Sequence, residues 1–175
     1  RQIISDKCST VYATERAANE TFSTKASQIR KRLLLTDEMR LIMMFEDGFP
    51  SGGFIDCIDF LKPLERSSSA IDLISLRKLR TMLDTLRKVV GFFEGVKDEV
   101  YPNLKRMSAH ILAFPEVQRR IDMIIDRYGD VKDTASDELY EIRRSLRDKE
   151  GAISRRINAI LKKAQEEGIV DSDAG

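Results

Sequence analysis

A leucine-rich run in the middle of the chain constrains the fold more than any other feature of the sequence. Its apolar residues alternate steps of three and four, and they are Leu76, Leu79, Leu83, Leu86, Val90 and Phe93. This spacing predicts one long helix with a heptad-like apolar face. Such a face requires another helix beside it, so we expect the chain to fold as a helical bundle.

Helical periodicity extends over most of the remaining chain and predicts an all-α fold. Further helices are expected over residues 10–22, 25–46, 58–66, 101–111 and 115–126. The spacing of four between Ile4, Cys8 and Tyr12 indicates a first helix that is already under way where the chain begins. At 175 residues, with 34% charged residues and only four prolines, the chain suits one helix-rich domain.

The last helical run is unusually long. It is expected to begin at about Thr134, because "TASD" fits a helix-start pattern. Its apolar positions continue to residue 164 and are Leu139, Ile142, Leu146, Ile153, Ile157 and Ile160. About thirty residues make a helix of roughly 45 Å. A helix of that length should project from the bundle as an arm, and residues 167–175 should fray.

The polar stretch between the last two predicted helices is either a catalytic loop or a joint. Its aspartates, Asp130 and Asp133, are close together in one loop, where acids usually form turns and begin helices. A joint is therefore the better interpretation. In it Gly129 allows the turn, Val131 packs into the bundle, and Asp133 or Thr134 begins the arm.

The sequence offers no catalytic, cofactor-binding or metal-binding residues. His110 is the only histidine, whereas metal sites in helical proteins need several ligands. The Gly-rich "FPSGGF" lacks the lysine and hydroxyl of a phosphate-binding loop. Cys8 and Cys57 are expected to be reduced thiols in a cytoplasmic protein. No apolar stretch approaches the roughly 20 residues that cross a bilayer, so no membrane partner is expected.

One local cluster of bases is a candidate for contact with nucleic acid. Arg155, Arg156, Lys162 and Lys163 occur between residues 151 and 164, a stretch without acids. They could meet phosphate, with non-specific and salt-sensitive binding. The alternative is the solvated face of an amphipathic helix. The net charge of +1 gives the molecule no global field that would decide between them.

Two segments resemble the amino-terminal region of the type-two bacterial MutS proteins. The first is a Gly-Gly-x-x-Asp segment formed by Gly52, Gly53, Phe54, Ile55 and Asp56. The second is more specific, and its matching positions are Asp126, Gly129, Val131, Asp133, Ala135, Ser136, Leu139, Ile142 and Arg143. One departure is that Cys57, Ile58 and Asp59 stand where the family often has an arginine, so any nucleic-acid contact made by that arginine would be absent here.

The resemblance implies a fold and a parent protein. It implies a helical core over residues 1–133, truncated at its start, and a first lever-arm helix over 134–166 that leads toward a DNA clamp. It further implies a homodimeric, DNA-binding parent that uses ATP and Mg, carries an associated endonuclease, and suppresses recombination in DNA repair. Rescue of collided ribosomes is a further role that the resemblance implies. All catalytic domains of such a parent would lie outside this chain, so the chain itself is expected not to be an enzyme.

A protein of another class also fits the pattern. The two apolar faces could belong to a stand-alone helical adaptor that binds partner helices. The two interpretations differ in what a longer parent protein would contain, because the MutS-like interpretation requires an ATPase domain and the adaptor interpretation does not.

Overall fold

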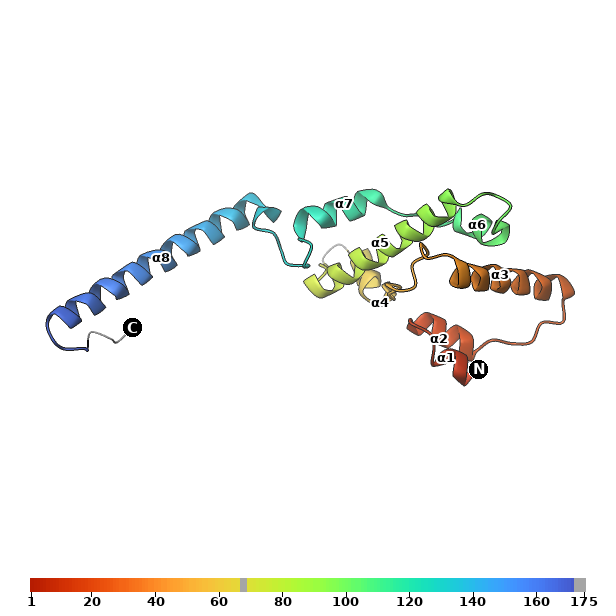
Figure 1. The fold of residues 1–175 in the computed structure, drawn as a ribbon, viewed down its shortest axis with the longest axis horizontal. Coiled ribbons are helices and arrows are strands. Elements are labelled where there is room, and N and C mark those ends of the chain that lie inside the picture. Colours follow the sequence, from red (N-terminus) through yellow and green to blue (C-terminus); the bar gives the residue numbers. More distant parts are fainter. Residues whose placement is uncertain (67–68, 172–175) are drawn as a thin grey trace. The chain divides into compact units, whose positions relative to one another are not determined.

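The computed structural model of the chain describes residues 1–66 and 69–171, which are organised as helices and connecting loops (Figure 1). The elements are α1 (Gln2–Ser5), α2 (Val11–Ala18), α3 (Ala26–Phe45), α4 (Ile58–Leu61), η1 (Lys62–Glu65), α5 (Leu73–Gly95), α6 (Pro102–Ser108), α7 (Pro115–Ile124), η2 (Asp133–Ala135) and α8 (Asp137–Glu166). Within these described ranges there is no β-strand, and Ile125 and Val131 form an isolated bridge. The predicted all-α fold is confirmed.

The chain divides into two compact units, Arg1–Ile121 and Asp122–Gly175. The first unit contains α1 to α6 and most of α7, and the second contains the end of α7, η2 and α8. The expected division into a core over 1–133 and a lever arm from 134 concerns the domains of a longer protein, and it stays a prediction. Part of the expected frayed tail, residues 172–175, lies outside the described residues.

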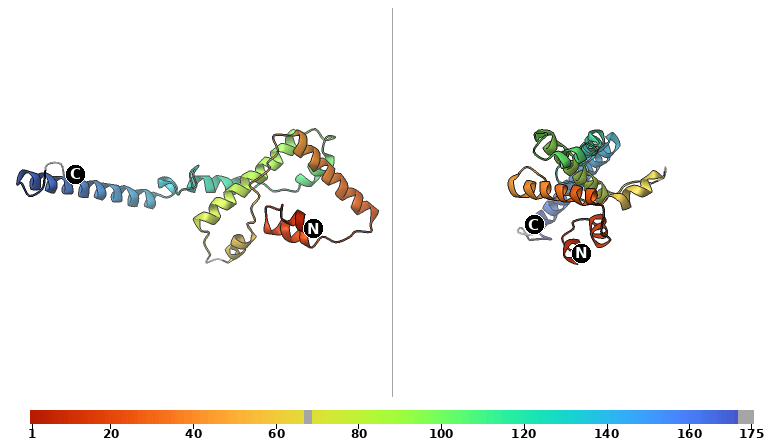
Figure 2. Two further views of the ribbon diagram at one scale, coloured as in Figure 1. Left: turned by 60° about the horizontal axis from the view of Figure 1, so that its bottom comes forward. Right: turned by 90° about the vertical axis from the view of Figure 1, so that its right-hand side faces the viewer.

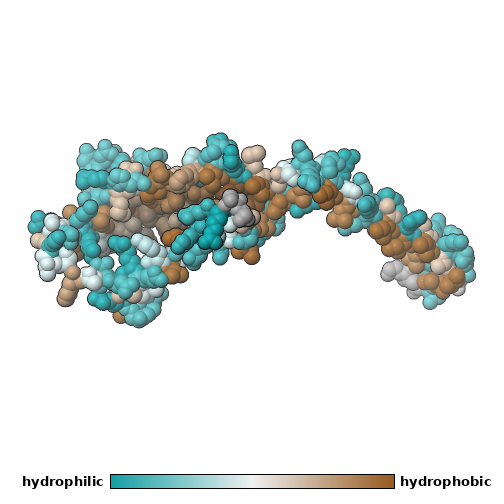
Figure 3. Space-filling model, turned by 180° about the vertical axis from the view of Figure 1, so that it is seen from behind, coloured by the Kyte–Doolittle hydropathy of each residue, from teal (hydrophilic) through white to brown (hydrophobic). Residues whose placement is uncertain are grey.

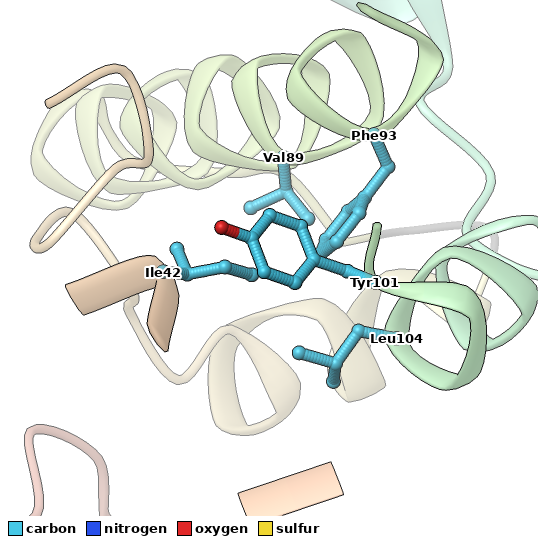
Figure 4. Packing of buried hydrophobic residues seen from close by; sticks show 5 residues of the cluster. All are labelled: Ile42, Val89, Phe93, Tyr101 and Leu104. Carbon is cyan, nitrogen blue, oxygen red and sulfur yellow. The ribbon is translucent and has the colours of Figure 1, made fainter. Parts of the chain in front are cut away.

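The core of the first unit lies where α3, α5 and α6 meet (Figure 4). Its buried side chains are Ile42, Val89, Phe93, Tyr101 and Leu104. The Tyr101 hydroxyl donates to a carboxylate oxygen of Glu46 at 3.0 Å, so the buried phenol is satisfied. Burial, followed by the hydrogen bond to Glu46, raises the pKa of Tyr101 above its ordinary value.

The apolar face of α5 provides the central wall of this core. Leu83 and Phe93 are 5% and 4% exposed, and the other four predicted face residues are half-buried. Phe93 also packs edge-to-face on Phe92, with ring centroids 5.1 Å apart, and Phe92 does the same with Phe49 at 5.2 Å. Each buried side chain of this kind contributes about 1.5–3 kcal/mol. Neighbours within the unit therefore bury part of the predicted apolar face, while Leu79, Leu83 and Leu86 line an apolar cavity of about 530 Å³.

The Gly-Gly-Phe segment is docked closely on α5. The Thr85 hydroxyl donates to the carbonyl oxygen of Gly53 at 3.1 Å. Gly53 has a φ of +81°, and a Cβ at this position would collide with the Thr85 hydroxyl oxygen. Both the backbone conformation and the close approach thus require glycine. By contrast, a Cβ at Gly52 would meet nothing within 4 Å.

A buried carboxylate from α3 caps the start of α6. Glu38 is 8% exposed, and its carboxylate oxygens accept hydrogen bonds from the backbone N–H groups of Asn103 at 3.1 Å and Leu104 at 2.8 Å. The Asn103 side-chain amide donates to the same carboxylate at 2.6 Å. The first N–H groups of a helix lack partners within the helix, and an acid is favoured there. Glu38 therefore fixes α6 on α3.

The start of the chain differs from the expected single helix. Ile4 and Tyr12 lie on separate short helices, α1 and α2, which pack against each other (Figure 2). The break occurs because the Thr10 hydroxyl accepts a hydrogen bond from the Ala13 N–H at 3.1 Å and begins a new helix. The regular spacing of four was thus misleading as a sign of one continuous helix.

Candidate nucleic-acid interface and the joint before it

The joint, residues 125–136, begins with a turn organised by Asp126. Its carboxylate accepts hydrogen bonds from the N–H groups of Tyr128 at 2.8 Å and Asp130 at 2.9 Å. Gly129 has a φ of +88°, the left-handed conformation that the turn needs. Burial alone would raise the pKa of Asp126, but hydrogen bonds from backbone N–H groups outweigh it and lower this pKa below its ordinary value.

The two sides of the turn are held together beyond it. Ile125 is 1% exposed and pairs with half-buried Val131 in the isolated bridge. The Lys132 N–H donates to the Ile124 carbonyl at 2.9 Å, and the Lys132 ammonium donates to the Asp122 carbonyl.

Asp133 then ties the joint to α8. Its carboxylate accepts from Arg143 at 2.5 Å and from Arg147 at 2.7 Å. Arg143 also donates to the carbonyl oxygen of Val131 at 2.9 Å, so one guanidinium joins two positions of the loop to the helix. The hydrogen bond from Arg143, and then that from Arg147, hold the pKa of Asp133 below its ordinary value. The sequence motif contains Asp133 and Arg143, but Arg147 was not singled out.

The long helix begins later than predicted. Asp133 and Thr134 lie in the 3-10 turn η2, and α8 starts at Asp137. The cap is Ser136, whose hydroxyl accepts from the Leu139 N–H at 3.1 Å. Its extended backbone, with φ −151° and ψ 156°, excludes the preceding residues from the α-helix. Thr134 is exposed and does not cap the helix.

The helix α8 runs unbroken for 30 residues and ends in a defined way (Figure 2). The Ile169 N–H donates to the Ala164 carbonyl and the Gly168 N–H donates to the Gln165 carbonyl, which is the Schellman arrangement. At about 1.5 Å per residue the helix is roughly 45 Å long, as expected.

The apolar positions of α8 are not buried within the described structure. None of its residues falls in the buried class. We call its exposed apolar side chains the apolar stripe; their exposed fractions lie between 55% and 68%, and they are Ile142, Leu146, Ile153, Ile157 and Ile160. Figure 3 shows apolar side chains following this helix between polar ones.

The four predicted phosphate-contacting bases share another face of α8. All are exposed, and Arg155 and Lys162, like Arg156 and Lys163, are seven positions apart. This basic face contains no described ion pair for Arg155 or Arg156. Lys162 and Lys163 lie 3.9 and 3.7 Å from the carboxylates of the next helical turn, Glu166 and Glu167. The two glutamates lie just beyond the acid-free stretch of residues 151–164. Both ion pairs are long and exposed, so they contribute little to stability.

Among residues 1–66 and 69–171, no three His, Cys, Asp or Glu side chains are grouped so that they could hold a metal ion. In the same part of the chain, no helix has the length and apolar character that crossing a bilayer requires. In the second half of α5, Arg87 and Lys88 both pair with Asp84, at 2.8 and 2.7 Å.

The structure thus defines an all-helical protein in which a cross-linked joint precedes a long, exposed helix. Curated proteins named Endonuclease MutS2 are similar to it over most of its length. The protein of Alkaliphilus oremlandii is 26% identical over 163 residues, which are 93% of this chain and 20% of that protein. Those of Thermomicrobium roseum and Clostridium botulinum (strain Alaska E43) are 27% and 29% identical over 95% and 77% of this chain.

These matches confirm the resemblance to the MutS2 family that the two motifs carried. The chain spans about a fifth of the length of these relatives. No family model matches the chain.

Proposed function

We propose that this chain is the helical core and first lever arm of a MutS2-like, ATP-dependent DNA-binding protein. The observation that supports this most strongly is the similarity to Endonuclease MutS2 proteins over as much as 95% of the chain. In this proposal the homodimer contacts, the endonuclease, and the residues that bind ATP and Mg belong to other parts of a longer protein. The chain itself performs no catalysis, and it acts in the cytoplasm on DNA in repair or recombination.

In this function, the joint transmits movement. A lever works only if its attachment does not yield, and Asp133 and Val131 are both cross-linked to α8 through Arg143. The bridge between Ile125 and Val131 continues this connection back to the end of α7. We therefore infer that a displacement of the end of α7 is passed to α8 without being lost in the loop.

The basic face of α8 is the proposed point of contact with DNA phosphate. Its four bases would together give a salt dependence with a slope of at most about −3.6 on duplex DNA. The chain alone should bind weakly, with a Kd of about 10⁻⁴ M, since it lacks a clamp that would enclose the duplex. Ribosomal RNA is a second polyanion that the same face could meet.

The test replaces the four bases Arg155, Arg156, Lys162 and Lys163 with glutamine and measures duplex DNA binding by fluorescence anisotropy at several salt concentrations. A matched variant with the same loss of charge replaces Lys7, Arg66, Lys97 and Arg120, which are exposed bases of the first unit. We expect weaker binding and a flatter salt slope only in the first variant. Equal effects in both would show a response to total charge and would contradict the proposed interface.

The helical adaptor remains a second candidate because the apolar stripe of α8 is exposed. An adaptor would need the stripe and not the basic face. Serine at Ile153 and Ile157 should then abolish capture of a partner protein, whereas the glutamine variant of the basic face should not affect it. The DNA-binding function predicts the opposite dependence in the anisotropy measurement.

A further inference from the structure

A small cavity between α3 and α6 is lined by bases that no described acid neutralises. It has a volume of about 160 Å³, and its lining residues are Lys31, Leu35, Asn103, Arg106, Met107 and His110. Among these described lining residues none is acidic. Lys31 comes from α3, whereas Arg106 and His110, four positions apart, come from α6 and the turn after it.

What distinguishes this cluster is that bases from two parts of the chain line one cavity. Some other bases of the first unit are held in ion pairs, as Arg40 is with Asp37 at 2.8 Å and Arg119 is with Glu116 at 2.6 Å. No such partner is described for Lys31, Arg106 or His110, although all three side chains are exposed.

A carboxylate that contacts one lining residue, Asn103, is already occupied. Glu38 accepts hydrogen bonds from Asn103 and Leu104 at the start of α6, and it is buried. Its charge is thus directed at backbone N–H groups rather than at the bases of the cavity. Lys105, the base next to Arg106, is paired with Asp98 at 2.7 Å and does not line the cavity.

The geometry points to a phosphate-binding site, and we propose that the α3–α6 cavity binds one phosphate group. Lysine and arginine donate charge-assisted hydrogen bonds to phosphate oxygens, and histidine adds a further donor. Leu35 and Met107 supply the apolar part of the lining. The cavity is smaller than the roughly 300–1,000 Å³ of sites that enclose a whole drug-sized ligand. It therefore suits a single phosphate, either a phosphodiester of nucleic acid or a free phosphate ion.

This site is independent of the basic face of α8, because all its residues lie in the first unit. If the phosphate belongs to DNA, the site extends the proposed function to the helical core. If the ligand is free phosphate, the site does not depend on the proposed DNA-binding function.

The test follows the backbone amide signals of the 175-residue chain by NMR during titration with inorganic phosphate, and separately with a short DNA duplex, at constant ionic strength. We expect saturable shifts at Lys31, Asn103, Arg106 and His110. In the variant Lys31→Gln/Arg106→Gln the apparent affinity should fall about tenfold, since two solvent-exposed charge contacts are lost. The control Arg30→Gln/Lys97→Gln removes exposed bases that do not line the cavity and should leave the affinity unchanged.

The two sources of phosphate give different results. A duplex that shifts these amides and is displaced by inorganic phosphate identifies a phosphodiester site, and shifts with inorganic phosphate alone identify a site for the free ion. Either result should persist in the glutamine variant of the α8 basic face, so failure of the proposed function does not remove it. Absence of saturable shifts with both probes, or equal shifts in the cavity variant, would overturn the proposal.

Discussion

Two long amphipathic helices, α5 and α8, have similar apolar spacing but opposite surroundings. In α5 the apolar face is partly buried within the first unit, where Leu83 and Phe93 are nearly inaccessible and the other face residues are half-buried. In α8 the corresponding residues, such as Ile153 and Ile157, are both 57% exposed. Periodicity thus predicts which side of a helix is apolar, and it does not predict whether this chain supplies the partner.

The largest expected difference between the two helices comes from placing a charge on each apolar face. Leu83→Asp should lower the free energy of unfolding by about 3–5 kcal/mol, because it buries an unpaired carboxylate. Ile157→Asp should cost about 0.5 kcal/mol, since its site is exposed. Thermal and urea unfolding followed by circular dichroism measure both. Similar losses in the two variants would mean that the α8 stripe is covered in solution.

A second variant tests how closely the Gly-Gly-Phe segment is docked on α5. Gly53→Ala should destabilise the first unit by about 1–3 kcal/mol, because alanine is strained at a φ of +81° and would collide with Thr85. Gly52→Ala is the matched control and should be close to neutral, since a Cβ there meets nothing within 4 Å. Urea unfolding gives both values, and equal stability of the two variants would contradict the close docking on α5.

The beginning of α8 provides a smaller effect. Ser136→Ala removes the hydroxyl that accepts from Leu139 and should cost about 1 kcal/mol of helix stability. Thr134→Ala should change little, because Thr134 lies before the cap in η2. Amide hydrogen exchange over the first turn of α8 measures the difference. A larger loss from Thr134→Ala would restore the helix start that the sequence first indicated.

The smallest expected effect depends on pH. The folded-state pKa of Asp133 is lowered, so its contribution to stability is present above the ordinary carboxyl value of about 3.9 and is lost as pH falls through the folded value. Asp133→Asn should therefore lower the urea midpoint at neutral pH and approach the wild-type value in acid. Glu141→Gln, at an exposed site of α8, is the control and should show no such convergence. If the urea midpoint of Asp133→Asn stays below that of the wild type by the same amount at every pH, the pairs with Arg143 and Arg147 do not stabilise the fold through charge.

Much of the helical architecture could be predicted from the sequence, because local spacing determines it. The expected helix at 25–46 corresponds to Ala26–Phe45, and the one at 115–126 corresponds to Pro115–Ile124. Boundaries set by competing caps were less predictable. Thr134 and Ser136 both offer a hydroxyl, and only the backbone conformation of Ser136 decides between them.

Contacts between distant residues could not be predicted from spacing. Nothing in the sequence near Glu38 indicates that it binds the start of α6, and Arg106 and His110 give no local sign that Lys31 lies across the same cavity. The joint was easier to predict, since Asp133 and Arg143 are both motif positions. The motif does not show, however, that these two residues contact each other. The role of the basic face of α8 stays a prediction.

The cap that Glu38 places on α6 has a consequence for the order of folding. α6 has only seven residues, too few to persist as an isolated helix in water. Its stabilising carboxylate is 65 positions away along the chain. The helix should therefore appear only when α3 has already been brought to it, and the intervening loop must be closed first at an entropic cost. Folding of the first unit should accordingly be a concerted event governed by long-range encounter, whereas α8, stabilised by neighbours a few residues away, can form and fray on the timescale of a single helix.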